Sequence, residues 1–196
     1  MTIEATENKP AIVEFKEWPK TARHFRDIVV TEKIDGTNSA LHITPDGQVQ
    51  AQSRNRLIYP TKSLDNYGFA TWAEAHAEEL ATLLGPGLHY GEWWGNGIQR
   101  GYGMAEKHFW MFNTRLKDKI HYNKPEGLNI GTVPVLYEGP NDTSEIRAAL
   151  IQLRDSGSVA APGFMSPEGV CIYHSTLRTV SKVTLDNNDA GKWEAA

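Results

Sequence analysis

Apolar and polar residues alternate with two different periods along this chain, and the change of period marks the elements that the sequence predicts. Residues 27–33 contain the apolar run Ile28-Val29-Val30 and predict a strand. Residues 39–53 alternate around Pro45-Asp46-Gly47, which predicts two strands joined by a short turn. Between Phe69 and Leu84 the apolar residues recur about every 3.6 positions, as in an amphipathic helix, and a Gly-Pro-Gly sequence then ends the run.

The second half of the chain returns to strand patterns. Its segments rich in aromatic and β-branched residues are 88–94, 107–113, 132–139, 169–174 and 179–185. A second helix is predicted to begin at Asp142, whose side chain can cap the first turn, and to end at Gly157. Since strands dominate with two helices between them, we expect an α+β fold built on antiparallel β-sheets with intercalated helices.

Composition favours a globular protein made of one domain. The 196 residues are 40% hydrophobic and 22% charged, and no repeat or linker-like segment divides residues 1–196. No apolar run approaches the length of a bilayer, the N-terminus lacks the pattern of a secretion signal, and Cys171 is the sole cysteine. We therefore expect a protein of the reducing cytoplasm without membrane association.

Charge and motifs exclude several classes of protein. A net charge of −4 argues against coating nucleic acid through a general positive field, although local basic clusters remain at 16–26 and 54–56. The seven histidines show no zinc-site spacing, and no Gly-rich phosphate-binding loop of the common types is present. The acidic residues are plentiful but give no specific indication of a glycosidase.

Lys33 is the candidate nucleophile. It stands at the end of an apolar strand and is followed closely by Asp35 and Gly36, which predict a tight turn. An amine attacks phosphorus only when it is neutral, so a working Lys33 needs desolvation or neighbouring cations that favour the uncharged form. A K-x-D-G string by itself is also what an ordinary strand end looks like, so the assignment depends on other motifs.

Five separated stretches supply those motifs. They are EKIDGTN at 32–38, QSRNR at 52–56, YGEWWGNGIQRGYG at 90–103, HFWMFN at 108–113, and SPEGVCIY followed by VSKVTL within 166–185. Their order and rough spacing resemble the covalent nucleotidyltransferase superfamily of polynucleotide ligases and mRNA capping enzymes. Within it, the chain is most similar to ATP-dependent RNA ligases of the phage RNA ligase 2 type, over about residues 31–185.

The resemblance implies a fold, a reaction and its cofactors. The fold would be the nucleotidyltransferase, or adenylation, domain of polynucleotide ligases. Lys33 would take AMP from ATP with Mg²⁺ (or Mn²⁺), releasing pyrophosphate and forming a lysyl-AMP intermediate. AMP would pass to a 5′-phosphate, and a 3′-hydroxyl would then displace it to join the two nucleic acid ends, preferably of RNA.

The resemblance also implies roles for individual residues. Asp35 and Gly36 would shape the turn beside the nucleotide, and Arg54 would grip phosphate oxygens with its guanidinium. Glu92 would accept a hydrogen bond from the ribose, and Phe112 would stack on the purine.

Glu168 and Lys182 complete this set at the phosphates. Glu168 would hold a hydrated metal ion, since Mg²⁺ prefers oxygen ligands. Lys182 would neutralise the charge that builds on the phosphate.

Departures from the family pattern leave other functions open. The chain has Asp35 where the nearest relatives often have His, Asn113 where an Asp is usual, and Lys182 without a second lysine two residues away. About ten residues follow Leu185, so we expect no appended C-terminal domain, and the N-terminal basic segment or a partner protein would help to grip RNA. The alternatives are a DNA ligase-like or capping-type transferase, and a degenerate module that binds nucleotides or nucleic acid without catalysis.

Overall fold

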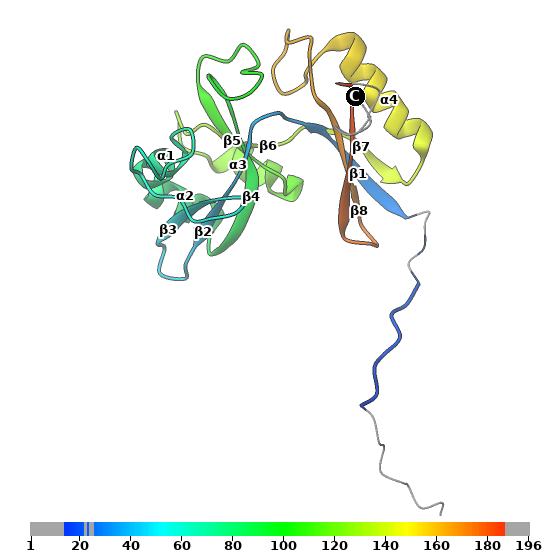
Figure 1. Cartoon of the computed structure of the whole chain (residues 1–196), viewed down its shortest axis with the longest axis horizontal. Helices are drawn as coiled ribbons and strands as arrows, with labels where there is room; N and C mark the ends of the chain where they lie inside the picture. The colour runs from blue at the N-terminus through cyan, green and yellow to red at the C-terminus, as the bar shows by residue number, and fades with distance from the viewer. Residues whose placement is uncertain (1–13, 22, 24–25, 187–196) are drawn as a thin grey trace, which may run out of the picture.

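The computed structural model describes residues 14–21, 23 and 26–186, whose strands form two sheets (Figure 1). Sheet A has the strand order β7 (Val135–Pro140), β1 (Asp27–Lys33), β8 (Gly169–His174), β9 (Thr179–Thr184). Sheet B has the order β3 (Val49–Ser53), β2 (Thr37–Ile43), β4 (Gly87–Gly95), β5 (Lys107–Met111), β6 (Ile130–Thr132). All neighbours are antiparallel except β5 and β6, so the predicted α+β fold rich in antiparallel sheet is confirmed.

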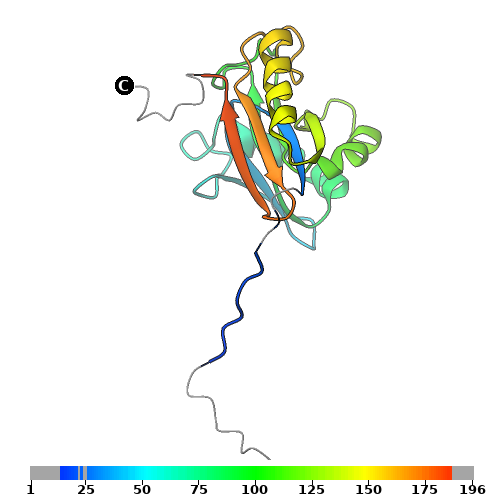
Figure 2. The ribbon, with the colours of Figure 1, turned by 90° about the vertical axis from the view of Figure 1, so that its right-hand side faces the viewer.

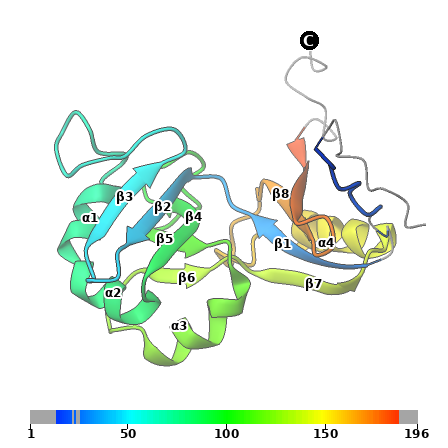
Figure 3. The ribbon, with the colours of Figure 1, turned by 90° about the horizontal axis from the view of Figure 1, so that it is seen from below.

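Helices cover one face of each sheet. The helical segments are α1 (Phe69–Ala75), α2 (Ala77–Leu84), the 3₁₀ turn η1 (Thr114–Leu116), α3 (Lys117–Asn123) and α4 (Thr143–Ser156). The first three α-helices lie on the sheet B side of the molecule, and α4 packs on sheet A (Figure 3). Asp142 caps α4 as predicted, because its side chain accepts a 2.8 Å hydrogen bond from the Ser144 N–H. Within the described ranges, every helix is too short or too polar to cross a membrane.

Each sheet has its own hydrophobic core. Phe69, Trp93 and Phe109 lie in the core between sheet B and its helices, whereas Val30 and Leu153 lie between sheet A and α4. A third group of buried residues fills the space where the chain passes between the sheets. We call it the junction cluster: Ile34, Trp94, Tyr102, Val133, Ala160 and Ala161. Strand β1 leads directly through this junction into β2 (Figure 3).

Two elements that the sequence predicted as continuous are each divided in the structure. The single helix predicted up to Leu84 is two helices, because His76 has non-helical angles of φ −113° and ψ 21°. The apolar period survives the break since both helices pack into the same core. The single strand predicted at 132–139 is also two, β6 in sheet B and β7 in sheet A, with the buried Val133 between them in the junction cluster.

Candidate active site

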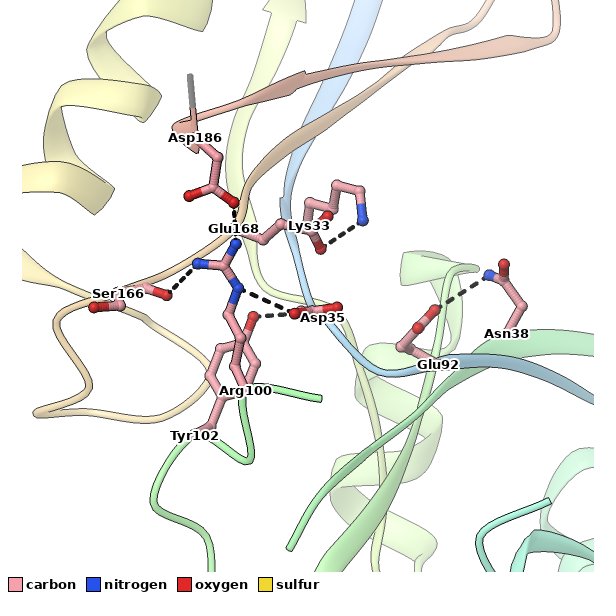
Figure 4. A network of polar contacts seen from close by, with 9 residues as sticks. All are labelled: Lys33, Asp35, Asn38, Glu92, Arg100, Tyr102, Ser166, Glu168 and Asp186. Atoms are coloured by element: carbon pink, nitrogen blue, oxygen red, sulfur yellow. Dashed lines mark hydrogen bonds and ion pairs between the residues drawn. The ribbon is translucent and has the colours of Figure 1, made fainter. Parts of the chain in front are cut away.

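Lys33 is the last residue of β1, at the point where the chain leaves sheet A for the junction. It pairs with Gly169 of β8, so the residue before that strand, Glu168, lies beside it. The Lys33 Nζ and a Glu168 carboxylate oxygen are 2.5 Å apart, and the two side chains are 21% and 16% exposed (Figure 4). The lysine therefore has an acidic partner at this site, where the sequence argument expected desolvation or neighbouring cations.

Glu92 brings sheet B to the same site. It lies on β4 and is 8% exposed, and the amide of Asn38 on β2 donates to its carboxylate at 3.2 Å. Burial raises the pKa of Glu92 to about 8, while the Lys33 ammonium and the Gly36 N–H favour its ionised form. The influence of Lys33 on this carboxyl indicates that the two groups lie within electrostatic reach of one another across the junction.

Lys182 lies on the face of sheet A that carries Lys33. It pairs with Cys171 of β8, which in turn pairs with Thr31 of β1, and alternation along β1 then puts Lys33 on this face. Burial raises the pKa of the Cys171 thiol, and Lys33, Glu168, Glu92 and Lys182 all act on it electrostatically. Four charged residues predicted for one site thus act electrostatically on a single cysteine.

Gly36 allows the chain between β1 and β2 to pack closely against Trp93 and Glu92 of β4. A Cβ atom on residue 36 would lie 2.5 Å from the Trp93 carbonyl oxygen and 3.0 Å from Cγ of Glu92. The glycine is required here because of this close approach, whereas the sequence argument gave it a part in shaping the turn. Its N–H also hydrogen-bonds to the Glu92 carboxylate, so it fixes the orientation of that side chain.

Asp35 points into a polar network that sequence reasoning missed. Arg100 donates through Nε to Asp35 at 3.0 Å and through a terminal nitrogen to the Ser166 carbonyl at 2.9 Å, and it also pairs with Asp186 (Figure 4). The Asp35 N–H donates to the Tyr102 hydroxyl oxygen at 2.9 Å. Arg100 therefore ties three separate segments together beside Lys33 and Glu168.

A signal for this network was present in the sequence. Arg100 and Tyr102 lie in the glycine-rich stretch after β4, part of the motif YGEWWGNGIQRGYG, but neither residue had been given a role. Gln99 and Tyr102 adopt positive φ angles of 47° and 51° in this loop. Strained non-glycine backbone between glycines is a feature of loops that position side chains.

Phe112 and Arg54 lie near Glu92 on sheet B. Glu92 pairs with Trp110, and the Phe112 N–H donates to the Tyr90 carbonyl oxygen at 3.0 Å, so strand alternation puts Phe112 on the face of Glu92. Phe112 is 45% exposed, which leaves its ring available to a ligand.

Arg54 is exposed and directly follows β3, where Ser53 pairs with Ser39. The chain leaves β3 beside Asn38, the residue that holds Glu92.

Glu32 is a buried carboxylate next to Lys33 on β1. It is 1% exposed and accepts hydrogen bonds from the Ser158 hydroxyl at 2.5 Å and from the N–H groups of Val159 and Ala160 at 2.9 Å. Burial raises its pKa, and the hydrogen bonds act in the opposite direction. Glu32 therefore anchors the segment after α4 to β1 immediately beside Lys33.

The donor set suits a hard divalent cation. Mg²⁺ usually binds one or two carboxylates and completes its coordination with water and phosphate oxygens. Glu168 supplies such a carboxylate near Lys33, and Glu92 lies close enough to influence the same region. No group of three or more His, Cys, Asp or Glu side chains within the described residues could hold a metal, so a bound ion would depend on water and substrate.

Comparison with known proteins gives a family and a fold. A family model described as RNA ligase matches residues 26–185. Similar solved structures include a mutant of the Naegleria gruberi RNA ligase with ATP and Mn, which has a TM-score of 0.62 and 18% identity and covers 82% of this chain and 50% of that one. A mutant with AMP and Mn has a TM-score of 0.59 at 18% identity, over 81% of this chain and 49% of that one.

The same ligase with PPi has a TM-score of 0.58 at 18% identity, over 81% of this chain and 49% of that one. At this identity the likeness concerns the fold, and the chain spans about half the length of these solved structures. A search of curated proteins gave no match.

Proposed function

Because the chain belongs to the RNA ligase family, we propose that it is an ATP-dependent RNA ligase with the nucleotidyltransferase fold. It joins 5′-phosphate and 3′-hydroxyl ends through a lysyl-AMP intermediate. The observation that carries this proposal is that Lys33 pairs with Glu168 and shares one face of sheet A with Lys182, while the buried Glu92 of sheet B lies within electrostatic reach of Lys33. The ATP, AMP and PPi in solved structures of the Naegleria gruberi enzyme support ATP as the donor of AMP.

In the first step, the Lys33 Nζ attacks the α-phosphorus of ATP. The Lys33 ammonium first loses one proton to solvent and becomes the neutral amine. The new N–P bond forms as the bond to the pyrophosphate oxygen breaks, pyrophosphate leaves with the electrons of that bond, and a second N–H proton passes to solvent. Lys33 is paired with Glu168 in the free protein, so this pair must separate before the attack. A divalent ion held by Glu168 would supply positive charge next to the phosphate. Lys182, on the same face of sheet A, would stabilise the charge that builds on the phosphate oxygens.

The nucleoside would lie toward sheet B. A carboxyl oxygen of Glu92 would accept a hydrogen bond from a ribose hydroxyl, and Phe112 on the same face would stack against the purine. Arg54 could reach phosphate oxygens from the end of β3, since a guanidinium donates two parallel hydrogen bonds. Asp35 would act indirectly, because it holds Arg100 and the turn that carries Gly36.

The later steps move AMP from protein to RNA. A 5′-phosphate oxygen of the RNA attacks the phosphorus of lysyl-AMP, the N–P bond breaks, and Lys33 regains its proton. A 3′-hydroxyl then attacks the RNA 5′-phosphorus, a phosphodiester forms, and AMP leaves with the electrons of the broken P–O bond. Both displacements occur at phosphorus beside the cations Lys33 and Lys182, which stabilise the transition state charge.

Intact mass measurement after incubation with ATP and Mg²⁺ or Mn²⁺ tests the first step. The wild type should gain the mass of one AMP, and Lys33→Ala should gain none. Lys117→Ala, which changes an exposed lysine of α3, is the matched control and should gain AMP normally. An unchanged wild-type mass would refute the proposal and favour a module that binds nucleotides without catalysis.

Sealing assays test the substrate. The proposed ligase should join nicked RNA duplexes or single-stranded RNA ends more readily than nicked DNA. Efficient sealing of DNA alone would favour a DNA ligase-like enzyme, and transfer of the nucleotide to a 5′-diphosphate end would favour a capping-type transferase.

A further inference from the structure

One row of side chains on sheet A is exposed and unexplained by the steps above. Val29 of β1 pairs with Tyr173 of β8, which pairs with Val180 of β9. We call these three residues the Tyr173 row. Tyr173 is 40% exposed and Val180 is 64% exposed, although both are apolar enough to favour burial.

The Tyr173 row lies on the open face of sheet A. Ile172, its neighbour on β8, points into the core beneath α4, so alternation turns Tyr173 to the opposite face. Figure 2 shows β8 and β9 side by side, with α4 along the same sheet. The row therefore continues the face that carries Lys182, two residues from Val180 along β9, or roughly 7 Å.

The direction of the nucleotide identifies what could reach this row. The argument here rests on the proposed function. If the purine lies against Phe112 on sheet B, the phosphates extend toward Lys33 and Lys182 on sheet A. The RNA 5′-phosphate that later attacks the α-phosphorus displaces the Lys33 Nζ in line, so it approaches opposite that amine. It stays close to Lys182, and the exposed face of sheet A that carries Lys182 lies beside it.

Charge and chemistry along β9 suit a nucleic acid end. Lys182 lies at one end of the exposed segment, and the exposed Arg178 lies at the hairpin before it. Glu138 of β7 pairs with Val29 at the far end of the row, so phosphates are favoured on the β9 side. Because the net charge of the chain is −4, general electrostatic attraction to RNA is weak and stacking has to contribute to affinity.

We propose that the Tyr173 row binds the 5′-terminal nucleotide of the RNA to be adenylylated. The base stacks on the Tyr173 ring and contacts Val180, which fixes the 5′-phosphate beside Lys182. Aromatic side chains on open sheets bind unpaired bases in this way in other RNA-binding folds. Tyr173 is then a substrate-positioning residue that contributes to AMP transfer to RNA and has no effect on self-adenylylation.

The test separates the two half-reactions. The protein is first incubated with ATP, and formation of lysyl-AMP is measured by intact mass. The rate of AMP transfer is then measured as a function of the concentration of a 5′-phosphorylated single-stranded oligoribonucleotide. Tyr173→Ala should charge like the wild type and show a KM for the RNA about 5- to 100-fold higher, the loss expected for one stacked base. Tyr173→Phe should stay close to the wild type, because stacking needs the ring and not the hydroxyl.

Two further variants complete the design. Tyr122→Ala, which removes a tyrosine 78% exposed on α3, is the control and should leave both reactions unchanged. Val180→Asp, at a more exposed position, puts a carboxylate in the row and should also raise the KM for RNA if Tyr173→Ala does not fold. A wild type that gains no AMP would overturn the proposed function, whereas normal charging with an unchanged KM in the Tyr173 and Val180 variants would overturn this inference alone.

Discussion

Replacing Glu92 by Gln should make the stability of the protein less dependent on pH. Burial raises the pKa of this carboxyl from 4.5 to about 8 in the folded state. Between pH 4.5 and pH 8 the folded protein therefore holds a proton on Glu92 that the unfolded chain releases. The contribution of this carboxyl to the free energy of unfolding is fully present below pH 4.5 and is lost as pH rises through 8. A glutamine at residue 92 has the shape of the protonated acid and cannot ionise.

The size of the effect follows from the two pKa values. Between pH 5 and pH 9 the free energy of unfolding of the wild type should fall by about 4 kcal/mol more than that of Glu92→Gln. Urea unfolding at steps of pH, followed by tryptophan fluorescence, measures both curves. The tryptophans at 93 and 94 are buried beside residue 92 and report directly on this part of the structure.

A matched variant at an exposed glutamate shows whether the change in pH dependence results from the burial of Glu92. Glu138→Gln removes an exposed carboxylate of β7, and its pH–stability curve should run parallel to that of the wild type. Curves for Glu92→Gln and the wild type that stay parallel from pH 5 to pH 9 would refute the reasoning. That result would mean that water or a cation reaches residue 92 well enough to keep it ionised.

Three other substitutions test the surroundings of Lys33. Gly36→Ala should lower stability by about 1–3 kcal/mol in urea unfolding and weaken self-adenylylation, because the new methyl group meets the Trp93 carbonyl oxygen at 2.5 Å; normal activity would contradict the close approach. Arg100→Lys should lose about 1 kcal/mol and slow the reaction with ATP, since lysine cannot bridge Asp35 and the adjoining segments with one planar group; equal rates would show that charge alone suffices. Glu32→Ala should cost about 3 kcal/mol or more by leaving three donors unpaired, and a melting temperature equal to that of the wild type would exclude the anchoring role.

Local sequence patterns predicted most of the strands, because each has the alternation of a half-buried sheet. They failed where tertiary contacts decide the outcome. Val133 is apolar and continues the pattern of its neighbours, yet it is buried between two sheets and interrupts the strand. The helix α3 was not predicted, since it is seven residues long and Ile120 is its one buried residue, too little for a recognisable period.

The sequence motifs proposed Lys33, Glu92, Glu168 and Lys182 for one site but could not predict their contacts. In the structure all four act electrostatically on Cys171, and their roles stay predictions. Periodicity could not show that Glu168 would hold Lys33 as an ion pair, because that contact joins residues 135 positions apart. The contacts of Arg100 could not be predicted either, since its partners come from three distant segments.

The inert side chains of the junction cluster lie between the two sheets that carry the candidate site residues, so they determine how these sheets are aligned. Glu92 is carried by sheet B, whereas Lys33 and Glu168 are carried by sheet A, and each sheet keeps its own hydrogen bonds and core. A slight tilt of one sheet against the other would change the spacing between these reactive groups without breaking either sheet. In the proposed reaction, large buried rings such as Trp94 between the two sheets would therefore determine how precisely these groups are aligned, although they take no part in the chemistry.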